Sequence, residues 1–270
     1  MTVWLFYTLL GLIQGFTEPI PISSSGHLVI FQELFNIDLP GLSFEVFVNF
    51  ASLLAVLTVY RKDVIRLIVS LWTFLFKKDR TDETMVDVKF IGLLLVATVP
   101  AGVLGVIFGD WIGEVLGGVA TVGYTLIITG LALWFIRNMR GNRGDGGITL
   151  RDAVLIGLAQ AVALIPGISR SGATIVMAML LGIKQESALR FSFFLFIPIS
   201  LGTMILDGPA LFTNPETRDL FGPLILAFIA SYVLTAISLK WFQHIMAKGE
   251  LKYFSYYCWI VGLLVVLFLA

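Results

Sequence analysis

Two stretches of this 270-residue chain decide its fold: GLIQGFTEPIPISSSGHLVI (11–30) and GLAQAVALIPGISRSGATIV (157–176). Both begin and end with apolar residues, but glycine, proline, serine and glutamine interrupt their middles. A shift of 146 positions aligns them without a gap. The identical pairs are Gly11/Gly157, Leu12/Leu158, Gln14/Gln160, Ile22/Ile168, Ser23/Ser169, Ser25/Ser171 and Gly26/Gly172. The chain is therefore expected to contain an internal repeat, each copy starting with a broken helical segment.

The composition is typical of a membrane protein. The chain is 58% hydrophobic and only 13% charged, and its mean hydropathy is +0.94. A soluble domain carries roughly a quarter charged residues. The formal net charge is zero, so no basic excess indicates binding to nucleic acid. The single cysteine excludes an intrachain disulfide.

Six stretches are long and apolar enough to be candidates for crossing the hydrocarbon core, which takes about 17–25 helical residues. They are Phe44–Tyr60, Val88–Phe108, Gly118–Ile136, Phe191–Leu206, Gly222–Leu239 and Tyr253–Ala270. A shorter stretch, Ile65–Phe76, has basic flanks and is expected to lie at the interface or to extend the first span. The interrupted regions 3–35 and 148–182 are expected to form re-entrant helical hairpins, which enter the membrane and return.

The expected fold is an all-α integral membrane protein with about six transmembrane helices and two re-entrant helical hairpins. The first repeat covers residues 1–140 and the second covers 147–270, within a single membrane domain. Each repeat contains one hairpin and three spans, and an odd number of crossings inverts the second copy relative to the first. Inverted repeats bring two broken helices together and create a polar site between them.

The distribution of charge predicts the orientation. Most Lys and Arg residues fall in four segments: 61–89, 137–151, 184–190 and 240–252. The loops between them, 31–43, 109–117 and 207–221, are mainly acidic. The positive-inside rule places the basic segments in the cytoplasm and both termini outside. Arg170 belongs to neither set of loops, which marks it as unusual.

The two hairpins carry polar and ionisable side chains, which are costly in a membrane and therefore indicate function. The first hairpin contains Gln14, Thr17, Glu18, Ser23, Ser24, Ser25 and His27, and the second contains Gln160, Ser169, Arg170, Ser171 and Thr174. A purely structural alternative is an ion pair between Glu18 and Arg170 that joins the hairpins. That alternative leaves the histidine and the many hydroxyl groups unexplained.

These side chains are suited to phosphoryl chemistry. The guanidinium of Arg170 binds phosphate oxygens as a fork, and broken helices supply backbone N–H groups for anions. Glu18 is a candidate general base or ligand of a hard cation, and Gln14 lies one turn earlier on the same helix face. His27 is a candidate nucleophile, acid or base. A site that transports an anion is the alternative.

The stretches QGFTEPIPISSSGH (14–27) and PGISRSGAT (166–174) closely resemble the two signature motifs of bacterial undecaprenyl-diphosphate phosphatases, the bacitracin-resistance family. Length, hydrophobicity and the repeat agree over the whole chain. The resemblance implies hydrolysis of undecaprenyl diphosphate to undecaprenyl phosphate and inorganic phosphate, on the outer face of the bacterial cytoplasmic (inner) membrane. This reaction recycles the lipid carrier for peptidoglycan and other envelope polymers.

The resemblance also implies roles for individual residues. The expected catalytic residues are Glu18, His27, Arg170 and Ser24. The expected substrate-binding residues are Gln14, Ser23, Ser25, Ser169, Ser171 and Thr174. Glu18 and Gln14 are expected to hold a divalent cation, Mg²⁺ or Ca²⁺. The family has Glu or Gln at the position of Gln14, and the uncharged Gln found here leaves Glu18 to hold the metal largely alone.

Several points stay open at this stage. The attacking group is His27, Ser24 or an activated water, and a unit of His27 with Glu18 is favoured, with Arg170 stabilising the transferring phosphoryl group. Glu45 and Asn49 either face the site or form interhelical hydrogen bonds. The expected partners are a polyprenyl diphosphate lipid and a second copy of the chain. A transporter or flippase of a phosphorylated lipid or anion is the alternative function.

Overall fold

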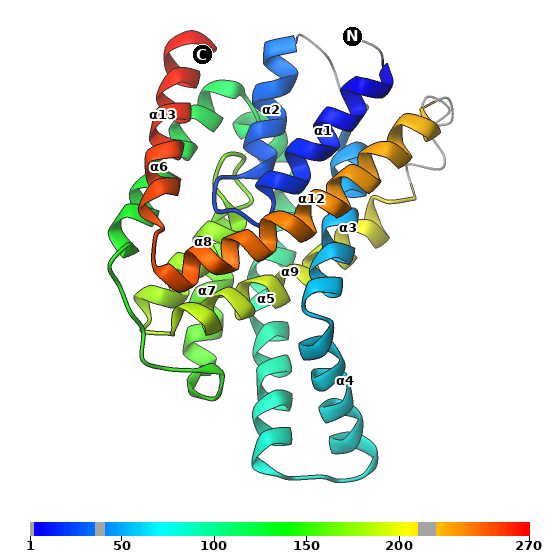
Figure 1. The fold of residues 1–270 in the computed structure, drawn as a ribbon, viewed down its shortest axis with the longest axis vertical. Coiled ribbons are helices and arrows are strands. Elements are labelled where there is room, and N and C mark those ends of the chain that lie inside the picture. Colours follow the sequence, from blue (N-terminus) through cyan, green and yellow to red (C-terminus); the bar gives the residue numbers. More distant parts are fainter. Residues whose placement is uncertain (1–2, 36–40, 210–219) are drawn as a thin grey trace.

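The computed structural model describes residues 3–35, 41–209 and 220–270, and its regular secondary structure over this part of the chain is helical (Figure 1). The helices are α1 (Val3–Thr17), α2 (Ser24–Phe35), α3 (Gly41–Val59), α4 (Arg61–Phe76), α5 (Asp82–Leu116), α6 (Val119–Ile136), α7 (Leu150–Val162), α8 (Arg170–Leu180), α9 (Gln185–Leu206), α12 (Phe221–Lys248) and α13 (Lys252–Phe268). A short 3₁₀ turn, η1 (Asp145–Gly147), precedes α7. The expected all-α fold is confirmed.

The chain is a multi-pass membrane protein. Within the described residues, α5, α6, α9 and α12 are long and apolar enough to cross a membrane. Helices α3 and α4 meet at an angle of 79° and form a fifth span if the bent pair counts as one. Helix α13 is apolar but shorter, with 17 residues. The count of six spans therefore stays a prediction.

The stretch Ile65–Phe76 lies in α4, a separate helix that bends away from α3 instead of extending it in a straight line. Helix α4 packs against α5. Figure 1 shows the turn between them at one end of the molecule and both chain termini at the other. The basic residues of that turn, Lys77, Lys78 and Arg80, are thus far from the termini, as the predicted orientation requires.

Both interrupted regions form hairpins of two short helices. In the first hairpin, α1 ends at Thr17 and α2 begins at Ser24. In the second, α7 ends at Val162 and α8 begins at Arg170. Each second helix has the same N-terminal cap, because the Oγ of the preceding serine accepts a hydrogen bond from a glycine N–H. The Gly26 N–H donates to Ser23 over 3.3 Å and the Gly172 N–H donates to Ser169 over 3.1 Å. The serines and glycines that match in the repeat therefore form the same local structure.

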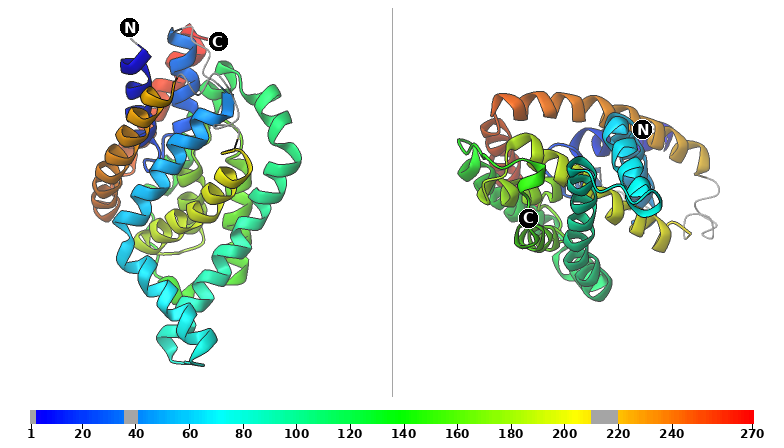
Figure 2. Two further views of the ribbon diagram at one scale, coloured as in Figure 1. Left: turned by 90° about the vertical axis from the view of Figure 1, so that its right-hand side faces the viewer. Right: turned by 90° about the horizontal axis from the view of Figure 1, so that it is seen from below.

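The first arm of each hairpin packs against a long helix of the other half. Helix α1 lies along α12, and Figures 1 and 2 show the two side by side; α7 lies along α5. Matched glycines allow both approaches: a Cβ at Gly11 would collide with the backbone of Ala227, and one at Gly157 with that of Ala97. This reciprocal packing supports the predicted repeat, whose boundaries at 1–140 and 147–270 stay a prediction.

We predict that Gly157→Ala destabilises the protein by about 1–3 kcal/mol, because the added methyl group has no room against α5. The matched control is Gly92→Ala on the exposed side of α5, where no atom lies within 4 Å of the new Cβ. This control is expected to be neutral or stabilising because alanine favours helix by about 1 kcal/mol over glycine. Thermal unfolding in detergent measures both, and equal effects would contradict the close packing of α7.

Candidate active site

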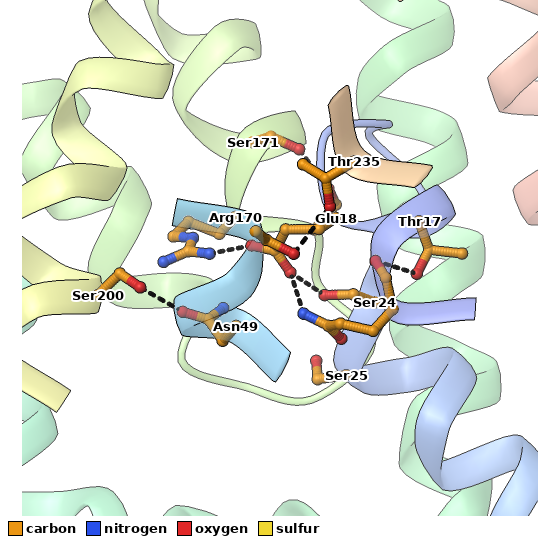
Figure 3. A network of polar contacts seen from close by, with 12 residues as sticks. Thr17, Glu18, Ser24, Ser25, Asn49, Arg170, Ser171, Ser200 and Thr235 are labelled. Carbon is orange, nitrogen blue, oxygen red and sulfur yellow. Dashed lines mark hydrogen bonds and ion pairs between the residues drawn. The ribbon is translucent and has the colours of Figure 1, made fainter. Parts of the chain in front are cut away.

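The carboxylate of Glu18 is the centre of a polar network at the break of the first hairpin (Figure 3). Its Oε1 forms an ion pair with the guanidinium of Arg170, the first residue of α8. Its Oε2 accepts hydrogen bonds from Gln14 Nε2 at 2.9 Å and from Ser24 Oγ at 2.5 Å. The side chains of Glu18 and Arg170 are only 7% and 24% exposed. The structure thus brings together four of the predicted site residues from both halves of the chain.

Two helix N-termini meet around this carboxylate. Ser24 is the first residue of α2 and Arg170 is the first residue of α8, and the two positions are equivalent in the repeat. The first N–H groups of a helix have no partner within the helix, and the helix dipole adds partial positive charge there. The fold therefore creates a place suited to an anion, to which Arg170 adds a full positive charge.

A cavity of about 280 Å³ adjoins the network. Its polar lining residues are Glu18, Ser23, Ser24, Ser25, Glu45, Asn49, Gln160, Ser169, Arg170, Ser171 and Thr203. Typical pockets for drug-sized ligands measure about 300–1,000 Å³, so this cavity suits a small headgroup. Its lining contains two carboxylates and one guanidinium, which leaves it with more negative than positive charge when all three are ionised.

A larger cavity of about 640 Å³ lies elsewhere and has a different character. Its charged lining residues include Asp63, Arg140, Lys184 and Arg190, from segments predicted to face the cytoplasm. None of the residues predicted for catalysis, substrate binding or metal binding lines it. The chemistry therefore favours the smaller cavity as the functional site, despite its size.

His27 does not line the smaller cavity. Its side chain is buried, with Nδ1 2.7 Å from the carbonyl oxygen of Ser23 and Nε2 2.7 Å from the hydroxyl of Tyr257. A carbonyl only accepts, so Nδ1 donates to Ser23, and in a neutral imidazole Nε2 then accepts from Tyr257. The favoured unit of His27 with Glu18 is therefore not formed, and a catalytic role for His27 stays a prediction.

The predicted substrate-binding hydroxyls fall into two groups. Ser25 and Ser171 line the cavity, and each pairs with the capping serine before it at 3.4 Å or 3.2 Å. Thr174 is almost fully buried and lies outside the cavity lining. Its hydroxyl donates to the carbonyl of Arg170 at 3.0 Å and lies 2.5 Å from that of Ser192. Thr174 therefore holds the first turn of α8, and its contact with substrate stays a prediction.

Four polar residues that line the cavity received no role in the predicted site: Glu45, Asn49, Gln160 and Thr203. The sequence left it open whether Glu45 and Asn49 face the site. Asn49 both faces the cavity and bonds between helices, since its Oδ1 accepts from Ser200 Oγ at 2.5 Å. Glu45, one turn earlier on α3, also lines the cavity. Gln160 on α7 lines it too, and its identity with Gln14 in the repeat is the signal that would have identified it.

Known proteins resemble this chain over almost its full length. The family described as bacitracin resistance protein BacA matches residues 7–264. The chain belongs to this family. An undecaprenyl-diphosphatase of Oceanobacillus iheyensis is 56% identical over 97% of this chain and 96% of the relative. Undecaprenyl-diphosphatase 3 of Bacillus anthracis is 57% identical over 97% of each chain, and undecaprenyl-diphosphatase 1 of Halalkalibacterium halodurans is 51% identical over 97% and 96%.

Membership of the BacA family confirms what the two motifs indicated, and the structure shows why both are needed together. The first motif supplies Gln14, Glu18 and Ser24, and the second supplies Arg170. Their side chains meet although Glu18 and Arg170 lie 152 positions apart in the sequence. Each motif therefore supplies one half of a single site in this BacA-family chain.

We predict that Glu18→Ala lowers the stability of the protein by about 3 kcal/mol, because it leaves the partly buried charge of Arg170 without its partner. The double variant Glu18→Gln/Arg170→Met removes both charges and is expected to recover most of this loss. Thermal unfolding of the two variants in one detergent measures the difference. A double variant less stable than Glu18→Ala would contradict the pairing.

Proposed function

We propose that this chain hydrolyses undecaprenyl diphosphate to undecaprenyl phosphate and inorganic phosphate, and so recycles the lipid carrier for envelope polymers. The observation that carries the proposal is the meeting of Glu18, Ser24 and Arg170 beside one cavity. Three relatives that match the chain over almost its full length carry the name undecaprenyl-diphosphatase. The cavity takes the diphosphate headgroup, and the isoprenyl tail stays among apolar surfaces of the spans.

Arg170 positions the headgroup in the proposed mechanism. A guanidinium has five N–H donors, and only Nη2 of Arg170 pairs with Glu18. Within the described residues, Nη1 and Nε of Arg170 form no hydrogen bond. They are proposed to bind phosphate oxygens, together with the N-terminal N–H groups of α2 and α8. The ring of Phe196 supports the guanidinium from one face, 4.2 Å from its carbon to the ring centroid. Arg170 therefore stabilises the charge of the transferring phosphoryl group.

Ser24 is the proposed nucleophile and Glu18 its base. The Ser24 hydroxyl already donates to the Glu18 carboxylate at 2.5 Å. The Oγ attacks the terminal phosphorus, its proton passes to Glu18, and the bond from that phosphorus to the bridging oxygen breaks. Undecaprenyl phosphate leaves, and water then attacks the phosphoserine, releasing inorganic phosphate while Ser24 recovers a proton. The alternatives are a water activated directly and attack by His27, whose two ring nitrogens are engaged by Ser23 and Tyr257.

A divalent cation, Mg²⁺ or Ca²⁺, is proposed to accompany the substrate. Hard cations prefer oxygen ligands, and Mg²⁺ is commonly held by one or two carboxylates plus substrate phosphates. Among the described residues there is no group of three or more His, Cys, Asp or Glu suited to a metal. Glu18 and Glu45, which line the same cavity, suit such a cation. Gln14 donates to Glu18 through its Nε2, and a direct bond from Gln14 to the cation stays a prediction. When bound, the cation offsets the charge of the diphosphate.

The proposed location is the bacterial cytoplasmic membrane, with the smaller cavity open to the outer side and both termini outside. The positive-inside rule supports this orientation, because the basic turn between α4 and α5 lies at the end of the molecule opposite the termini (Figure 1). The expected homodimer stays a prediction.

The deciding experiment measures inorganic phosphate released from farnesyl or undecaprenyl diphosphate by the purified protein. We expect release that a chelator stops and that added Mg²⁺ or Ca²⁺ restores, and we expect Glu18→Gln to lose it. Indifference to the chelator would remove the cation from the mechanism. No release from well-folded protein would favour the alternative, a transporter or flippase that binds the same headgroup.

Substitution of the candidate nucleophiles separates the mechanisms. Ser24→Ala is expected to lower kcat by at least about 100-fold, the usual size of a lost catalytic group, and to form no phosphoserine in rapid-quench experiments with labelled substrate. The control is Ser70→Ala, which removes a serine on α4, away from the cavity. Labelled histidine in the wild type, lost in His27→Ala, would instead identify His27 as the attacking residue.

A further inference from the structure

The amide of Gln160 is buried without a partner. Its side chain is only 2% exposed, and among the described residues neither its Nε2 nor its Oε1 forms a hydrogen bond. Four other buried polar atoms of the described residues share this property, one each in Asp145, Gln185, Ser255 and Trp259. Within the described part of the chain, Gln160 is the only one of these residues that lines the smaller cavity.

Comparison of the two repeats shows why the Gln160 amide lacks a hydrogen-bond partner within the described residues. Gln160 is equivalent to Gln14, whose Nε2 donates to Glu18 one turn later. The position equivalent to Glu18 is Leu164, which has no acceptor in its side chain. The second hairpin therefore has the amide but not the carboxylate that would satisfy it. A buried amide without a hydrogen bond is costly, so a partner from outside the protein is expected.

The chemistry of the cavity identifies that partner. A carboxamide offers two N–H donors and one acceptor without adding charge. Arg170 and the hydroxyls of Ser24 and Ser171 line the same cavity, and all three suit phosphate oxygens. We propose that Gln160 binds the phosphate oxygens of the headgroup through its Nε2, as a substrate-binding residue supplied by α7. This inference rests on the proposed function, because it assigns a ligand to the same site.

Gln160→Leu tests the proposal through binding and through stability. Leucine removes the donors and leaves no unpaired amide, so the melting temperature without ligand is expected to be unchanged or higher. The KM for farnesyl diphosphate is expected to rise about 10- to 100-fold, the effect of losing a hydrogen bond to a charged group. The shift in melting temperature caused by inorganic diphosphate is expected to shrink in the same variant.

A second variant and a matched control sharpen the test. Gln160→Glu keeps the shape but places a carboxylate beside the phosphate, so it is expected to weaken binding more than leucine does. Tighter binding by this variant, in the presence of Mg²⁺, would overturn the role of Nε2 as donor. The control is Gln185→Leu, which removes another amide with an unpaired Nε2 that lines the larger cavity. Its KM is expected to equal that of the wild type.

The two assays separate this inference from the proposed function. If Gln160→Leu keeps the wild-type KM and the wild-type response to diphosphate, the inference is wrong while hydrolysis stands. A marked fall in its melting temperature without ligand would also overturn it, since the amide would then be structural. If the wild type releases no phosphate yet diphosphate stabilises it through Gln160, the site binds the headgroup and the proposed hydrolysis is wrong. If Gln160→Leu shows a smaller melting-temperature shift with inorganic diphosphate but an unchanged KM for the lipid, Gln160 binds free diphosphate only, and its role with the substrate is overturned.

Discussion

The ion pair between Glu18 and Arg170 is the interaction on which the rest of the structure depends. An isolated charge in the membrane interior is costly, and each of these two compensates the other. They belong to different hairpins, 152 positions apart. Neither hairpin can therefore bury its charge until the other is in place, which links the folding of the two halves. Hydrogen bonds from Gln14 and Ser24 satisfy the second oxygen of Glu18 and complete the pair.

The broken backbone imposes a second constraint. Unpaired N–H and C=O groups are tolerated in a membrane only where protein or water surrounds them, so the two breaks must face each other. Gly26 lies against Gly167 of the other hairpin, and Gly172 lies against Pro21. Gly167 has a φ of +87°, a conformation that suits glycine, and the hydroxyl of Thr125 occupies the place where a Cβ would be. Burying the breaks together is what brings two helix N-termini to one place, so the anion site follows from the fold.

Local features of this fold could be predicted from the sequence, and of the long-range ones only the meeting of the two hairpins, which the repeat implied. Glycine, proline and serine break a helix through nearby atoms, and a charge in an apolar run is visible without a structure, so the hairpins and Glu18 with Arg170 were identified. The contact of His27 with Tyr257 depends on how α13 packs and carries no local signal. Hydropathy located the apolar stretch 88–108 but not the ends of its helix, because α5 continues on both sides of that stretch to a length of 35 residues.

The differences between the repeats explain why the site can work. The matched residues shape the backbone: Gly11 and Gly157 allow close packing, and Ser23 and Ser169 cap helices. The unmatched positions carry the charged groups and the proposed nucleophile, with Ser24 opposite Arg170 in the alignment and Glu18 opposite Leu164. Two identical copies would place like charges together, which disfavours ionisation of both. A paired carboxylate and guanidinium therefore require that the side chains differ while the backbone of the repeat is kept.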